Sequence, residues 1–226
     1  MKKLILFFFL SGLLFNLSAQ EIEVRKVGSF KGVKSSQAID VYLKKGDKEE
    51  VKVETSGIKL SEVITEVSGG TLRIHLDNGS YHKINVKVYV TYLTLEKISA
   101  SSASNIFSEG VIKSPSMDVS ASSAGSVEIS IESQRVSVGA SSAGNIQLEG
   151  KAINLEAEAS SAGDVDAYNL ESEVVNARAS SAGSLKIMAT KELEAHASSG
   201  GSIRYRGNPS RTNTGSSSGG SVKKSN

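Results

Sequence analysis

The sequence predicts an all-β protein, a parallel β-solenoid (β-helix-like) of about 19–20-residue repeats with an N-terminal portion rich in β-hairpins. Three observations carry this prediction: a recurring seven-residue phrase, period-two alternation around it, and short alternating strands before it. The phrase appears as ASSASNI, ASSAGSV, ASSAGNI, ASSAGDV, ASSAGSL and ASSGGSI, starting at 100, 121, 140, 159, 179 and 197, with a weaker SSSGGSV at 216. A near-constant step of this length is the signature of stacked supersecondary units.

Residues 1–20 have the layout of a secretory signal peptide. Two lysines precede an apolar run over 4–14, and small or polar residues separate this run from the charged text that begins at Glu21. The run is too short to span a bilayer, so we expect an exported protein. No second run of about 20 apolar residues occurs, which predicts that there is no transmembrane helix.

Residues 21–99 form the first portion of the predicted domain and are rich in Val, Ile, Tyr, Lys and Glu. The segment 39–55 alternates apolar and polar residues on both sides of a Gly-containing turn, which predicts a β-hairpin. Residues 57–67 fit either a short helix or a covering strand. Two further strands are predicted, over 71–76 and 84–100.

The repeats over 100–206 place apolar residues in fixed columns. Counted from the Ala that begins each phrase, the positions two and four before it and six and eight after it are apolar in almost every copy. The residues between them are mostly polar, so each unit is predicted as a strand, a corner and a second strand with one buried face. Ala157, Ala177 and Ala195 share one inward column and imply a narrow interior.

The SSAG phrase is predicted to be the corner. Its glycine column marks either positive φ or a close approach of two backbones. In the alanine column before it, a larger side chain is expected to collide with the next unit, and the serines are expected to bond local backbone or each other. In the first copy Ser104 replaces the glycine, which indicates a looser corner or a junction with the N-terminal portion. The glycine column consists of Gly125, Gly144, Gly163, Gly183 and Gly201.

Copies at one phase favour parallel stacking, but an antiparallel meander with SSAG as every second turn is the competing architecture. Residues 207–226 are mainly Gly, Ser, Asn and Thr, with Pro209 as a breaker. They fit a polar cap or a low-complexity tail, and we predict a tail. The predicted organisation is a signal peptide at 1–20, one domain at 21–206 and a polar tail at 207–226.

Three stretches also resemble a known family: GSFKGVKSSQAIDVYLKKGDKEEVKVE at 28–54, GGTLRIHL at 69–76 and VKVYVTYLTLEKISASSASNI at 86–106. Together with the serial ASSAG corners, they resemble DUF2807, the adhesins of auto-transporter type with a head GIN domain found in exported proteins of Bacteroidetes. The resemblance covers roughly 25–206. It implies a solenoid-like all-β domain at the cell envelope with an adhesin-like role, and it transfers no site residue.

Charge and cysteine content exclude some classes of partner. Five of the 26 basic residues lie outside 21–206, which leaves 21 basic against 24 acidic side chains there. No basic stripe interleaved with aromatic residues is visible, so we expect no nucleic-acid partner. The chain has no cysteine, so neither disulfides nor zinc thiolates are available.

The histidines are His75, His82 and His196, and none has the spacing of a metal motif. We expect all three on the solvated surface, with His196 in an outward column beside Glu158 and Arg178. No metal site and no cofactor are predicted.

Paired carboxylates are the alternative to a purely structural surface. Glu156 and Glu158 are predicted to share an outer face, as are Asp164 and Asp166, and Glu128 could complete an acidic patch. A catalytic pair needs two carboxyl groups at a fixed separation in a cleft. The two aspartates could bind Ca²⁺ weakly, but the nonapeptide of calcium-binding β-rolls is absent. We therefore predict ordinary surface charge and no catalytic residue.

The tyrosines Tyr81, Tyr89 and Tyr92 could form a sugar-stacking platform, although packing is the favoured role. The predicted function is an exported non-enzymatic cell-envelope protein, an adhesin-like binding or scaffolding module for an envelope glycan or protein. It would stay in the periplasm, reach the outer-membrane surface or leave the cell. The alternative is a carbohydrate-active enzyme, a lyase or glycosidase, on the same fold; an ice-binding solenoid and a plain structural spacer are further rivals.

Overall fold

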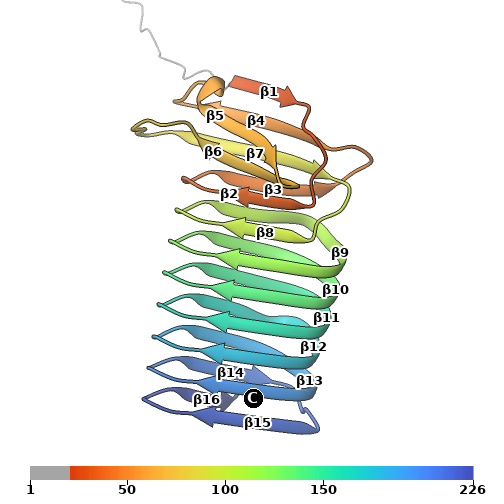
Figure 1. Cartoon of the computed structure of the whole chain (residues 1–226), viewed down its shortest axis with the longest axis vertical. Helices are drawn as coiled ribbons and strands as arrows, with labels where there is room; N and C mark the ends of the chain where they lie inside the picture. Colours follow the sequence, from red (N-terminus) through yellow and green to blue (C-terminus); the bar gives the residue numbers. More distant parts are fainter. Residues whose placement is uncertain (1–20, 226) are drawn as a thin grey trace, which may run out of the picture.

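The computed structural model describes residues 21–225 and is a parallel β-solenoid of about seven turns with repeats of about 19 residues (Figure 1). About 67% of the described residues lie in strands, and the 3₁₀ segment η1 (Leu60–Glu62) is a single short turn. The predicted fold class is therefore confirmed. The predicted signal peptide at 1–20 lies outside the described residues.

Each repeat is one long strand that bends in the middle, whereas the sequence predicted two strands. The first half of each strand follows a corner and belongs to what we call the leading sheet; the second half precedes the next corner and belongs to the trailing sheet. In Figure 1 the SSAG corners form the left edge, and the bends form the right edge, called the bend edge here. The five strands are β9 (Asn105–Ala121), β10 (Ser126–Ala140), β11 (Asn145–Ala159), β12 (Asp164–Ala179) and β13 (Ser184–Ala197).

The strands pair in parallel and in register, which rules out the antiparallel meander. Between β10 and β11 the pairing runs from Ser126↔Asn145 to Ala140↔Ala159. The variation in repeat length is absorbed by register shifts away from the corners, for example between Ala167 and Glu171 of β12. The inward columns therefore stay aligned, and they form one continuous buried core between the two sheets.

The corner glycines are required by a close approach of backbones, not by positive φ. A Cβ on Gly125 would lie 2.6 Å from the carbonyl oxygen of Ala100 on the preceding turn. Positive φ falls instead on the two central residues, at 49° for Ser123 and 59° for Ala124. Gly125 N–H donates to the Ser122 carbonyl at 2.8 Å, which closes a β-turn of type I′.

A main-chain ladder links consecutive corners. Ala124 N–H donates to the Ser142 carbonyl at 3.2 Å, and Ser141 N–H donates to the Ala121 carbonyl at 3.0 Å. The expected ladder of serine hydroxyls is not what holds the corners: main-chain hydrogen bonds link them, and central serines such as Ser142 are exposed. Ala124 is also exposed, so its backbone conformation, and not the predicted collision with the next unit, limits that column.

The repeat begins with a turn that comes from much earlier in the chain. β2 (Gly32–Ser35) lies between β6 and β8, and β3 (Asp40–Lys45) lies between β7 and β9. β2 and β3 are connected by a corner that the sequence analysis did not predict, with φ of 64° at Gln37 and 55° at Ala38. Ser104, which replaces the corner glycine, is fully buried and donates its hydroxyl to the Ser35 carbonyl at 2.9 Å. Ser104 therefore marks the junction with the N-terminal portion.

The hairpin predicted over 39–55 is wrong. β4 (Glu50–Ser56) pairs antiparallel with β7 (Asn85–Tyr92), and β7 in turn pairs in parallel with β3. β7 thus lies between the two predicted arms, and its alternating valines fill the same inward face. Beyond β4, the edge strand β1 (Glu21–Arg25) closes the leading sheet in antiparallel orientation.

The hairpin that does form joins β5 (Val63–Ser68) to β6 (Thr71–Leu76) through Gly69 and Gly70, both with positive φ. It ends the trailing sheet on the N-terminal side. The ambiguous segment 57–67 contains η1 followed by β5. The strand predicted over 84–100 is divided, because residues 93–96 turn the chain from β7 into β8 (Lys97–Ala100).

The tail predicted from residue 207 is also wrong over most of its length. After β14 (Ser202–Arg206), the strands β15 (Arg211–Ser216) and β16 (Ser221–Lys224) complete a further turn. β15 pairs with β13 and β16 pairs with β14, both in parallel. Polar residues such as Thr212 and Thr214 occupy inward columns here because no later described turn covers them, so hydrogen bonding of the main chain replaces apolar burial.

Candidate functional site

The outer faces of the two sheets carry the candidate binding residues. On the trailing face, next to the corners, lies a shallow hollow of about 540 Å³. Side chains of Glu158, Arg178 and His196 line it, from consecutive turns that pair in register. Gly215 continues this column on β15 and leaves the hollow open, because a Cβ there would meet the His196 ring. The hollow also includes the corner residues Ser160, Ser180, Ser198, Ser216 and Ser217.

A guanidinium between two carboxylates dominates the electrostatics of the hollow. Arg178 Nη1 lies 3.9 Å from Glu156 Oε1 and 3.8 Å from Glu158 Oε1. His196 Nε2 lies 3.3 Å from Glu194 Oε1. All these side chains are about half exposed, so the ion pairs contribute little to stability and remain accessible to a ligand. The predicted placement of His196 beside Glu158 and Arg178 is confirmed.

The four carboxylates considered for catalysis do not meet. Glu156 and Glu158 point outward from the trailing sheet, whereas Asp164 and Asp166 follow the next corner and point outward from the leading sheet. The apolar core separates the two faces. Glu128 belongs to the column of Asp166, with Gln147 between them, and not to the neighbourhood of Glu158.

Of the two aspartates considered for catalysis, Asp166 is held by neighbouring groups. Asp166 Oδ2 lies 2.8 Å from Lys186 Nζ, and its other oxygen accepts from the Tyr168 N–H at 3.2 Å. The hydrogen bond to Asp166 raises the pKa of Lys186 above its ordinary value, although burial acts in the opposite direction. Within residues 21–225, no group of three or more His, Cys, Asp or Glu side chains is arranged to hold a metal ion.

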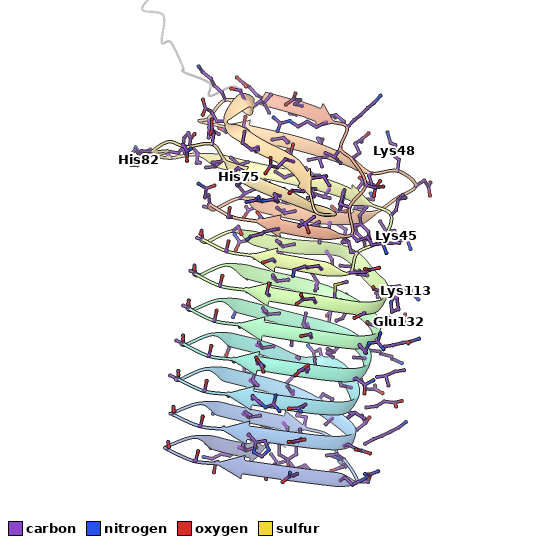
Figure 2. All side chains as sticks on the ribbon, viewed as in Figure 1. Lys45, Lys48, His75, His82, Lys113 and Glu132 are labelled. Atoms are coloured by element: carbon purple, nitrogen blue, oxygen red, sulfur yellow. The ribbon has the colours of Figure 1, made fainter. Side chains whose placement is uncertain are left out.

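The other two histidines lie in the N-terminal portion. His75 Nδ1 lies 2.9 Å from the Leu76 carbonyl, and the ring is half-buried. His82 is exposed in the loop that protrudes on the corner side (Figure 2). The two rings make different local contacts and do not form a shared site.

Of the three tyrosines considered for sugar stacking, only Tyr89 has its ring on an outer sheet face. Tyr92 is buried at 3% exposure, and this burial raises the pKa of its hydroxyl. Tyr81 is half-buried and donates to Glu62 at 2.9 Å; partial desolvation is the main reason why its pKa is raised.

Tyr89 belongs to an aromatic row that sequence reasoning missed. Its ring stacks on Tyr42 at 5.1 Å, and Tyr42 stacks on Phe107 at 5.4 Å. Lys52 Nζ lies 4.2 Å from the centre of the Tyr89 ring. Tyr42 has a ring on each side, and Tyr89 lies between Tyr42 and the Lys52 ammonium group, so neither of these two tyrosines has a free face for stacking on a sugar. The signal in the sequence was the position of these residues in the repeat. Tyr42 and Phe107 are each the third residue of the strand that follows a corner.

The bend edge carries a row of alternating charge. Lys113, Glu132, Lys151 and Glu171 pair in register on successive turns. Lys113 Nζ lies 2.7 Å from Glu132 Oε2, and this hydrogen bond holds the pKa of Glu132 below its ordinary value. Figure 2 shows both residues on the right-hand edge. Opposite charges in register explain this row as a feature that stabilises stacking.

The fold and its surfaces define a class of protein: a parallel β-solenoid with ordered polar outer faces. No helix in residues 21–225 is long and apolar enough to cross a membrane. A family described as "Putative auto-transporter adhesin, head GIN domain" (DUF2807) matches residues 29–209. The chain belongs to this family.

Solved structures share the fold. A "putative adhesin" from Bacteroides fragilis superimposes with a TM-score of 0.83 at 21% identity, covering 92% of this chain and 97% of that one. A "putative adhesin" from Parabacteroides distasonis gives 0.71 at 18% identity, covering 92% and 98%. A "putative lipid binding protein" from the same organism gives 0.68 at 18% identity, covering 92% and 97%. A comparison with curated proteins found no match.

Proposed function

We propose that the protein is an exported, non-enzymatic component of the cell envelope that acts as an adhesin-like binding or scaffolding module. The observation that carries this proposal is the register of the outer side chains. Glu158, Arg178 and His196, for example, lie in one column on consecutive turns. Such a surface is already ordered before binding, so an extended glycan or protein would meet it at a small entropic cost.

The family and the adhesin-named structures support the adhesin-like role. The separation of the carboxylates supports a non-enzymatic role, because Glu158 and Asp166 lie on opposite faces and cannot flank one scissile bond. A lyase or glycosidase activity is the alternative, and it would have to use one face alone.

The experiment is retention of labelled protein, from residue 21 onward, on separated glycan and protein fractions of the envelope. We expect one fraction to retain it, and we expect His196→Ala or Glu158→Ala to weaken retention if the trailing hollow makes the contact. Retention by neither fraction would contradict the proposal. Protease treatment of intact cells, read with an antibody, would distinguish periplasmic from surface location.

A further inference from the structure

The leading face changes its character towards the C-terminal end. The outward column that contains Tyr42, Phe107 and Asp166 continues with three cations, Lys186 on β13, Arg204 on β14 and Lys223 on β16, which pair in register. Neighbouring strands lie roughly 4.8 Å apart, so the column places one cation at each such interval. The sequence has no acidic residue after Glu194, so no carboxylate side chain from the last turns can neutralise the positive charge of this column.

Two of these cations have no charged partner. Lys186 is paired with Asp166 at 2.8 Å. Within residues 21–225, Arg204 and Lys223 make no ion pair and no side-chain hydrogen bond, and both are exposed. Unpaired cations in register repel each other, and an anionic ligand that follows the column would remove this repulsion.

A fourth cation is held in place by an aromatic ring. The guanidinium of Arg206 lies 4.1 Å from the centre of the Tyr168 ring, and the Tyr168 hydroxyl lies 2.7 Å from Ser225 Oγ. Tyr168 reaches this position because it lies at the register shift in β12 after Ala167. Stacking limits the freedom of the guanidinium while its N–H donors remain available, which suits recognition of carboxylate or phosphate oxygens.

A column of hydroxyls runs beside the cations. Ser184, Ser202 and Ser221 pair in register two residues before Lys186, Arg204 and Lys223. The surface therefore offers cations and neutral hydrogen-bonding groups in two parallel columns. This combination fits a polymer that carries acidic groups and hydroxyls in regular alternation.

We propose that this basic column, defined as Lys186, Arg204 and Lys223, together with Arg206 beside it, binds an anionic envelope polysaccharide lying along the solenoid axis. The proposal rests on the binding function proposed above and names the partner class and the surface. The carboxylate or phosphate groups of the polymer contact the cations, and its hydroxyls contact the serine column. Nucleic acid fits less well, because the Tyr168 ring beside these cations is already stacked with Arg206, which competes with stacking on a base.

The test measures binding of the chain from residue 21 to four probes at two salt concentrations: polygalacturonate, a phosphate-bearing mannan, neutral dextran and duplex DNA. We expect binding to at least one of the two anionic polysaccharides and no binding to dextran. The preferred polysaccharide identifies the acidic group as carboxylate or phosphate. Binding should weaken at high salt. Arg204→Gln and Lys223→Gln should each weaken binding by about two- to fivefold, because exposed charge contacts are individually modest. The triple variant with Arg206→Gln should lose roughly tenfold to a hundredfold.

The matched control is Lys34→Gln with Arg135→Gln, which removes two exposed cations from the trailing face. If the control loses as much affinity as the Arg204→Gln and Lys223→Gln substitutions together, net charge alone drives binding and the proposal is overturned. DNA binding as tight as that of the polysaccharides, and sensitive to the same variants, would also overturn it. Circular dichroism of each variant excludes unfolding as the cause.

The two proposals fail in different ways. Binding to a neutral glycan or an envelope protein, with no binding to either anionic polysaccharide, would overturn the basic column as the site and leave the general binding function intact. Binding to none of the probes and to no envelope fraction would contradict both.

Discussion

Substituting the two neighbouring corner residues Gly125 and Ala124 should have opposite effects on stability. In Gly125→Ala, the new Cβ would lie 2.6 Å from the Ala100 carbonyl oxygen and equally close to its carbon. Both are backbone atoms of a paired strand, so the clash cannot be relieved by a side-chain rotation. In Ala124→Gly, a residue with φ of 59° is replaced by one that adopts this conformation without strain.

The magnitudes follow from these contacts. Overpacking against backbone costs about 1–3 kcal/mol, and stretching the hydrogen bond from Ser122 N–H to the Ala100 carbonyl costs about 1 kcal/mol more. Gly125→Ala should therefore destabilise by about 2–4 kcal/mol. For Ala124→Gly, relief of the left-handed conformation by about 1–2 kcal/mol is offset by about 0.4–1 kcal/mol of unfolded-state entropy. The net effect is expected to be a gain of zero to about 1.6 kcal/mol.

The assay is thermal and denaturant unfolding followed by circular dichroism. A change of 1 kcal/mol shifts Tm by about 2–4 °C in a domain of this size, so Gly125→Ala should lower Tm by roughly 4–16 °C. Ala124→Gly should leave Tm unchanged or raise it slightly, as Gly200 with φ of 75° in the corresponding position of a later corner indicates. The control Ala177→Gly, in a buried strand position, should destabilise. Equal Tm values for Gly125→Ala and wild type would refute the close-approach account of the corner.

Three further predictions concern other parts of the solenoid. Ser104→Ala should cost about 1 kcal/mol in denaturant unfolding, because it removes the buried hydroxyl that donates to Ser35; the exposed Ser102→Ala is its control, and equal midpoints for the two would count against the junction. Glu132→Gln should lower Tm at neutral pH. Because the hydrogen bond from Lys113 lowers the folded pKa of Glu132 below its ordinary value, the stabilisation by this ion pair is present above that ordinary value and is lost as the pH falls through the folded pKa. Wild type and variant should thus converge in acid, and a gap that persists there would contradict the ion pair. Removal of residues 207–226 should lower Tm and expose β13 and β14 amides to hydrogen exchange, whereas loss of a mere tail would change neither.

The solenoid could be predicted from sequence because the repeated phrase allows the turns to be aligned with one another without a structure. Columns such as Val119, Val138 and Ala157 keep one phase across corners, and a phase that persists over many turns can be satisfied by parallel stacking. The glycine column was also visible, although sequence could not say which of two backbone reasons applied. The structure decides for close approach, because the positive φ angles belong to the Ser-Ala pair before each glycine.

The arrangement of the N-terminal portion could not be predicted because its pairing is not sequential. The arms of 39–55 alternate like a hairpin, but alternation describes only which face is buried, not which strand lies beside it. β7 competes for the same edge with Val86, Val88 and Val90 and takes the place between β3 and β4. When a later strand such as β7 inserts between two earlier ones, the sequence around those earlier strands carries no sign of it.

The last turn was mispredicted for a different reason. Composition suggested a tail because Thr212 and Thr214 stand where earlier repeats have Leu193 and Ala195. At the end of a solenoid only one side of the turn is covered, so main-chain pairing can hold polar inward residues. The basic column on the leading face shares this origin, since Arg204 and Lys223 fall in one column only if residues 221–224 are counted as a strand.

The most direct test of the central claim follows binding and turnover in one sample. The chain from residue 21 is incubated with envelope glycans, and retention and newly formed chain ends are measured together. The proposed function predicts retention with no new chain ends, in wild type and in the Asp164→Ala and Asp166→Ala variants alike. Turnover by wild type that is lost in either variant would contradict a non-enzymatic binding module.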